Sequence, residues 1–298
     1  MAAIRLQIRW FGVNKGVAST QKYEVADMFE AESKFVSLRK KLLDTRHPAW
    51  KKLVSVRGNI VNTWRNNTLP FPEPGIRLIR RRNLEVFGEK LKSLRDDLLD
   101  AERELDNSYA EMKSAASLRL GRLYDPSDYP DSVIGLFDAF TDHPNVTVPD
   151  YLRAFAPNIY EEEAERVRTR FDDAVKLAED AFFSELSKLI EHLTERISGT
   201  DDGKPKIFRD SVVTNLVEFF ERFRRLNIGS SEDLDRMVAR VRQIVGDTTA
   251  DDLRNNSTLR QHVATELSRV QSRLDGLMVD RPRRNLIRRN GGANANRD

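Results

Sequence analysis

Three aspartates close together form the strongest carboxylate cluster in the sequence. They are Asp125, Asp128 and Asp131, in the run Asp-Pro-Ser-Asp-Tyr-Pro-Asp. Carboxylate oxygens from one tight loop suit a hard divalent cation, so these residues are weak candidates for metal ligands. The run lacks the glycine of a calcium-binding loop, and aspartate beside proline also starts turns and caps helices. We therefore favour a structural role over a metal site.

The other residue types that carry chemistry are scattered or missing. The histidines lie far apart, and the sequence contains no cysteine. It has neither the glycine-rich motifs that bind nucleotides nor the G-x-S-x-G motif of serine hydrolases. We therefore expect a protein that is not an enzyme and uses no cofactor. A metal-dependent enzyme built around the aspartates is the weakest alternative.

Two groups of arginines could bind anionic partners. A flexible cationic tail gains affinity for nucleic acid by releasing counterions, so the C-terminal group offers an alternative function in nucleic-acid binding. A solvated tail that only keeps the protein soluble explains this group equally well. The first group is expected to pair with acidic residues of neighbouring helices. The first group is Arg77, Arg80, Arg81 and Arg82, and the second is Arg281, Arg283, Arg284, Arg288 and Arg289.

The composition is that of exposed helices rather than of a thick globular core. Of the 298 residues, 39% are apolar and 33% are charged, and 50 Lys and Arg against 47 Asp and Glu leave a formal charge of only +3. No field of one sign therefore draws the whole protein to nucleic acid or to a membrane. No apolar segment is long enough to span a bilayer, and no signal peptide opens the chain. We expect a cytoplasmic protein that does not bind membranes.

Residues 1–82 are predicted to combine a strand, a helical hairpin and a proline-rich loop. Apolar and polar residues alternate from position 4 to position 10, the pattern of a strand with one buried face. Residues 24–66 are interpreted as two helices broken at Pro48. The first is predicted over 24–44, with apolar residues at helical spacing at Phe29, Phe35, Leu38, Leu42 and Leu43. Prolines at alternate positions make 68–75 an extended loop. A short strand over 76–79 is possible.

Two long stretches carry the clearest pattern in the chain. In residues 84–120 and again in 159–198, apolar residues recur every three or four positions in a narrow stripe. We predict that these helices pair as an antiparallel coiled-coil hairpin within residues 83–200. The inserted residues 122–157 should then supply strand partners for the N-terminal strand. A heptad stripe does not identify its partner, so pairing between chains in a homo-oligomer is an alternative.

The C-terminal part is predicted to be a bundle of helices followed by a tail. Residues 204–279 hold three helical patterns, over 206–227, 231–245 and 250–278. Residues 280–298 are basic and rich in Gly and Asn, and are expected to be disordered. The fold class is thus mainly α with a small β element (α+β), with a long coiled-coil hairpin and a helical bundle.

A group of short motifs resembles a known family. The motifs are Thr68-Leu69-Pro70-Phe71, then Gly75-Ile76-Arg77-Leu78, and, after the long helix, Gly121-Arg122-Leu123-Tyr124 and Asp128-Tyr129-Pro130. Over roughly residues 1–200 they resemble an uncharacterised bacterial domain-of-unknown-function family carried by phages, plasmids and integrative elements. Genes of that family often lie near genes for MoxR-type AAA ATPases and von Willebrand A-type (VWA) proteins. The resemblance implies an accessory or adaptor role in an ATP-driven assembly.

We therefore expect a helical scaffold or adaptor that acts through protein–protein contacts. The rigid segment 68–82 is the predicted partner-binding surface, because a proline-rich loop presents side chains at low entropic cost. Its predicted binding residues are Leu69, Pro70, Phe71, Arg77 and Arg80.

Overall fold

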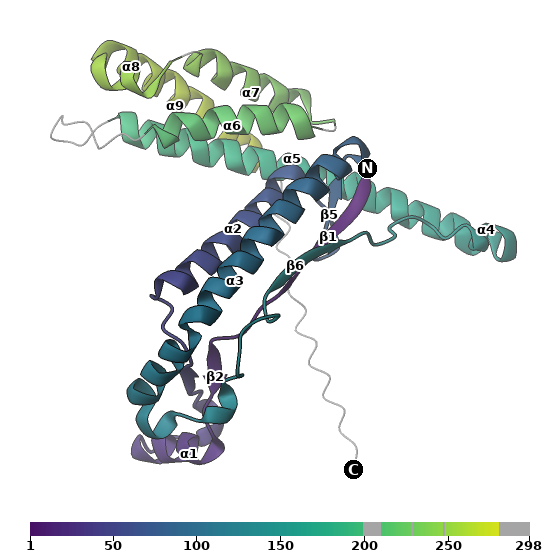
Figure 1. Ribbon diagram of the computed structural model, residues 1–298. Helices are drawn as coiled ribbons and strands as arrows, with labels where there is room; N and C mark the ends of the chain where they lie inside the picture. The colour runs from purple at the N-terminus through teal and green to yellow at the C-terminus, as the bar shows by residue number, and fades with distance from the viewer. Residues whose placement is uncertain (199–209, 228, 247, 280–298) are drawn as a thin grey trace. The chain divides into compact units, whose positions relative to one another are not determined.

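The computed structural model of the chain describes residues 1–198, 210–227, 229–246 and 248–279 (Figure 1). The chain divides into two compact units, residues 1–174 and 175–298. Helices dominate, and a four-stranded antiparallel sheet lies in the first unit, so the mainly α fold with a small β element is confirmed. Within the described ranges, no helix is both long and apolar enough to cross a membrane.

The N-terminal strand β1 (Ala2–Arg9) lies in the middle of this sheet. The strand order is β4-β5-β1-β6, with β4 at Leu69–Pro70, β5 at Ile76–Ile79 and β6 at Asp138–Asp142. The predicted strand over 76–79 is confirmed. The predicted supply of a strand partner by residues 122–157 is also confirmed, because β6 pairs with β1.

The predicted helix from residue 24 to residue 44 is wrong. The structure has α1 (Ser19–Met28), a 3-10 turn (Ser33–Phe35) and a two-stranded ladder of β2 (Asn14–Gly16) with β3 (Arg39–Lys41). Phe29 and Phe35 are six residues apart, a spacing that puts them on different faces of a helix. Both are exposed, so they never formed the buried stripe that the prediction assumed.

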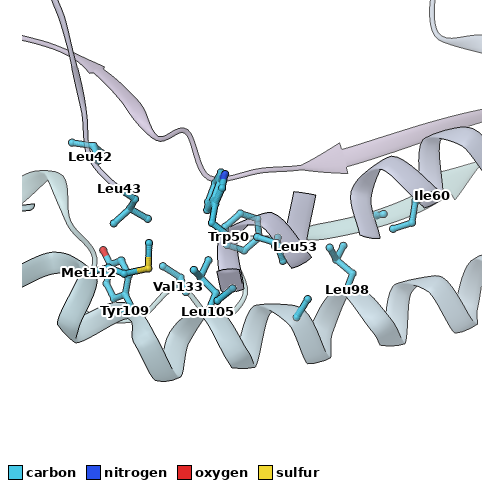
Figure 2. Close-up of a cluster of buried hydrophobic side chains, with 14 of the residues drawn as sticks. Leu42, Leu43, Trp50, Leu53, Ile60, Leu98, Leu105, Tyr109, Met112 and Val133 are labelled. Atoms are coloured by element: carbon cyan, nitrogen blue, oxygen red, sulfur yellow. The ribbon is translucent and has the colours of Figure 1, made fainter. Parts of the chain in front are cut away.

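Helices α2 (Pro48–Asn67) and α3 (Leu84–Leu120) form the main body of the first unit. The two run antiparallel: in Figure 2, Leu53 and then Ile60 of α2 follow one another in the same direction as Leu105 and then Leu98 of α3. All four side chains are fully buried. The bounds of α3 are those predicted, and its C-terminal cap is Gly121, which takes a φ of 50°.

The predicted pairing of residues 84–120 with residues 159–198 is wrong. The buried stripe of α3 belongs to a core cluster formed with α2, the sheet and residues 124–139. Among the described residues this cluster contains none from 159–198. The long antiparallel hairpin therefore exists, but α2 is the partner of α3. The physical reason is that an apolar stripe requires cover without specifying which helix provides it.

Polar contacts fasten residues 132–138 to α3. The buried Glu102 accepts a hydrogen bond from the backbone N–H of Phe137 at 3.1 Å. Asp106 accepts another from the N–H of Val133 at 2.8 Å. Arg95 forms a two-pronged ion pair with Asp138, at 2.8 and 3.0 Å. Helix α3 thus holds β6 in place beside β1.

The second unit is helical. The last part of α5 (Pro157–Ile197), which follows the short α4 (Tyr151–Phe155), buries Phe182 edge-on against Phe219 and Phe223. The remaining helices are α6 (Ser211–Leu226), α7 (Glu232–Val245), α8 (Ala250–Asn255) and α9 (Ser257–Val279). The single helix predicted over 250–278 is therefore two. Asn256 has an extended backbone there and caps α9 by accepting from the N–H of Leu259 at 2.9 Å.

Parts of the sequence-based predictions fall outside the described residues. They are the first residues of the helix predicted from 206 and the basic tail 280–298.

Replacing Leu105 by alanine tests the α2–α3 interface. We expect Leu105→Ala to lower the free energy of unfolding by about 2–5 kcal/mol, because the cavity lies in a fully buried seam. Leu118→Ala is the control, since Leu118 lies on the same helix but is 87% exposed. The control should change the free energy by less than about 0.5 kcal/mol. Urea unfolding measures both, and equal effects would contradict the assigned seam.

Candidate functional site

Two of the three clustered aspartates bind other groups of the same chain. Asp128 is buried between two lysines, with its carboxylate oxygens 2.5 Å from Lys15 Nζ and 2.5 Å from Lys40 Nζ. Asp125 caps the 3-10 turn Pro126–Asp128 by accepting from the N–H of Ser127 at 2.9 Å. Asp131 is exposed. In the described ranges no cluster of three or more His, Asp or Glu side chains is arranged to hold a metal ion.

The buried Lys40 connects two segments that are far apart in the sequence. Its ammonium group also donates to the carbonyl of Leu123 at 2.7 Å. Nearby, the Tyr129 hydroxyl donates to the carbonyl of Leu42 at 3.0 Å, and the Tyr129 ring stacks on Tyr124 at 5.1 Å. Burial raises the pKa of Tyr129 to about 12, so the phenol stays a donor. These motif residues therefore join β3 to the end of α3.

The ionisation of Asp128 contributes to stability. Burial alone would raise its pKa, but hydrogen bonds from Lys15 and Lys40 outweigh burial and bring the pKa below the ordinary 3.8. A carboxyl whose pKa is lower in the folded state stabilises the fold above the unfolded pKa. That contribution is lost as the pH falls through the folded pKa.

The substitution Asp128→Asn should be strongly destabilising at pH 7. We expect a loss of about 3–5 kcal/mol, because the buried Lys40 keeps its charge and loses its counterion. The difference from the unsubstituted protein should shrink as the pH falls below 3.8, the unfolded pKa, and through the lower folded pKa of Asp128. The double variant Lys40→Met/Asp128→Leu should recover most of the loss. Urea unfolding against pH measures this, and a loss that does not depend on pH would contradict the ion pair.

The predicted partner-binding segment serves the interior of the first unit. Leu69 and Phe71 are buried, and Phe71 packs edge-on against Phe171 with 5.7 Å between ring centroids. Pro70 and Arg80 are half-buried, and Arg80 makes contacts within the chain. The structure corrects the prediction for Leu69 and Phe71, because these two side chains are buried and not available to a partner.

Arg77 has a structural role as well. Its guanidinium donates to the Thr68 hydroxyl at 2.7 Å and to the Thr68 carbonyl at 2.8 Å. It also lies over the ring of Trp64, 5.4 Å from the centroid. Burial, and to a lesser extent the charge of Arg65, lowers the pKa of Arg77 to about 10. Arg77 therefore ties the end of α2 to β4 and β5. The C-terminal arginines, Arg281, Arg283, Arg284, Arg288 and Arg289, lie outside the described residues.

A different segment exposes large apolar side chains. Tyr23, Met28, Phe29 and Phe35 are 62%, 76%, 74% and 79% exposed. Single exposed apolar residues are ordinary, but several in one short segment mark an interaction surface. We call residues 19–35, with these four side chains, the α1 surface.

An open hollow lies on the α1 surface. It has a volume of about 540 Å³, and Tyr23, Ala26 and Ala31 contribute apolar lining while Glu24 and Asp27 contribute carboxylates. The sequence prediction missed this site because it placed Phe29 and Phe35 on a buried helical face. The six-residue gap between them was the signal against that placement.

The turn that ends α1 is strained. The N–H of Ala31 donates to the carbonyl of Ala26 at 2.9 Å, and the N–H of Glu30 to that of Asp27 at 3.0 Å. This is a Schellman motif, whose left-handed position normally holds glycine, but here Glu30 occupies it with a φ of 50°. Strained backbone of this kind is found where a segment serves function rather than stability.

Glu30→Gly should relieve this strain. We expect α1 to gain about 1 kcal/mol in local stability, because glycine adopts a positive φ without steric cost. Amide hydrogen exchange in α1 should slow by about fivefold. Glu32→Gly is the control, since Glu32 has an ordinary φ of −68° and glycine there should bring no gain. Equal exchange rates in Glu30→Gly and the unsubstituted protein would contradict the strain.

Comparisons with protein-family models, with curated proteins and with solved structures found no match.

Proposed function

We propose that the chain is a non-enzymatic helical adaptor of a phage or mobile element that binds a protein partner through the α1 surface. The observation that carries the proposal is the exposure of Met28, Phe29 and Phe35, each more than 70% accessible, in the same unit that buries the long stripe of α3. Apolar side chains exposed in this way cost free energy in water, and that free energy is recovered when a partner covers them.

The structure of the rest of the first unit supports a scaffold role. The α2–α3 hairpin and the Lys40–Asp128 ion pair give the α1 surface a rigid base, because Gln21 of α1 donates to the Arg122 carbonyl at 3.3 Å and Lys40 holds the neighbouring segment. A preorganised surface binds with a smaller entropic cost than a flexible one.

The resemblance of the motifs suggests the partner class. An AAA ATPase or a VWA protein encoded nearby would be that partner, and the chain would act in the cytoplasm as an accessory of an ATP-driven assembly. The motif residues support such a role indirectly, since Arg122 and Leu123 accept hydrogen bonds that hold the base of the α1 surface.

The double variant Phe29→Ser/Phe35→Ser tests this proposal. The purified chain is mixed with an AAA or VWA protein encoded by a nearby gene, and the Kd is measured by calorimetry. We expect the variant to bind at least tenfold more weakly, because two exposed rings lose the area they would bury. Both positions are exposed, so the melting temperature should not change.

Phe155→Ser is the matched control. Phe155 is an equally exposed phenylalanine, 85% accessible, on α4. Its substitution should leave the Kd unchanged. Loss of binding in Phe155→Ser but not in the double variant would move the interface to the α4 region and contradict the proposal.

A further inference from the structure

We infer that the occupant of the α1 surface is a basic amphipathic segment of the partner protein, with apolar residues on one side and Lys or Arg on the other. The inference rests on the proposed function, since it names the chemistry of the partner for that same surface. It comes from the charges that surround the exposed apolar side chains.

Carboxylates without a cationic partner surround the apolar residues. Glu24, Asp27 and Glu30 are exposed, and within the described part of the chain none of them forms an ion pair. Glu24 and Asp27 also line the hollow beside Tyr23 and Ala26. A ligand that enters the hollow therefore meets apolar surface and negative charge together.

The lysines of residues 19–35 do not neutralise these carboxylates. Lys34 is paired with Glu32 at 2.5 Å and lies over the Phe35 ring at 4.9 Å, so its charge is already engaged. Lys22 is the only other cation between residues 19 and 35. The whole chain carries +3, so the acidic character of the α1 surface runs against the overall charge.

Charge complementarity selects among the occupants. A symmetric pair of two copies through this surface would bring two acidic surfaces together, each with Glu24, Asp27 and Glu30, and like charges brought together are costly. An anionic lipid surface would be repelled for the same reason. A helix with apolar residues at i, i+3 and i+4 and flanking Lys or Arg satisfies both the hollow and its rim.

Two designed peptides probe this directly. One is an amphipathic helical peptide of Leu and Lys, and the other has the same pattern with Glu in place of Lys. Fluorescence anisotropy measures their binding to the full chain. We expect the basic peptide to bind at least tenfold more tightly than the acidic one, with an affinity that falls as salt rises. Light scattering of the chain alone reports self-association.

The charge-reversed variant Glu24→Lys/Asp27→Lys/Glu30→Lys should lose tenfold or more in affinity for the basic peptide. The matched control is Glu89→Lys/Asp96→Lys/Asp97→Lys, which reverses three exposed carboxylates on α3. The control should bind within about twofold of the unsubstituted chain. Absence of binding, equal binding of both peptides, an unchanged affinity after charge reversal, or a dimer that the reversal strengthens would each overturn the inference.

The same variants separate this inference from the proposed function. If Phe29→Ser/Phe35→Ser loses the natural partner while the charge-reversed variant keeps it, the surface is a docking site but its partner is not basic. If both variants keep the partner, the proposed function fails and the inference fails with it.

Discussion

The packing of α2 on α3 is the interaction on which the first unit depends. Leu53 and Ile60 of α2 pack on the apolar stripe of α3 and remove it from water. Glu102 and Asp106, which lie on α3 next to this stripe, then hold residues 132–138 by hydrogen bonds. Because those residues lead into β6, the helical seam also fixes the sheet. Without this seam, neither the strand order nor the base of the α1 surface would be defined.

The sequence predicts individual elements here better than it predicts their partners. The bounds of α3, its glycine cap and the strands β1 and β5 follow from local patterns, because period and capping are properties of neighbouring residues. Which helix packs on the apolar stripe of α3 depends on tertiary structure, and both α2 and residues 159–198 have apolar faces that could do so. The break at Asn256 was missed because apolar spacing continues across it.

The residues of the candidate site were hidden from sequence reasoning for a different reason. Motifs such as Asp128-Tyr129-Pro130 attract notice because Asp and Tyr can do chemistry, yet here they are satisfied by Lys40 and the Leu42 carbonyl. Phe29 and Phe35 attract none, since phenylalanine is assumed to be core. The sequence alone does not show that the carboxylate of Asp128 is buried and that the rings of Phe29 and Phe35 are exposed. In this protein the aspartate has a structural role, and the two phenylalanines lie on the proposed binding surface.

The position of β1 in the sheet affects how the chain matures during synthesis. Both neighbours of β1 lie downstream in the sequence, and the farther one, β6, is encoded more than a hundred residues later. At about 5–20 residues per second, β1 waits on the order of ten seconds for that neighbour to leave the ribosome. During this interval the edge of β1 that pairs with β6, residues 5–9, keeps its backbone hydrogen-bonding groups without their strand partner.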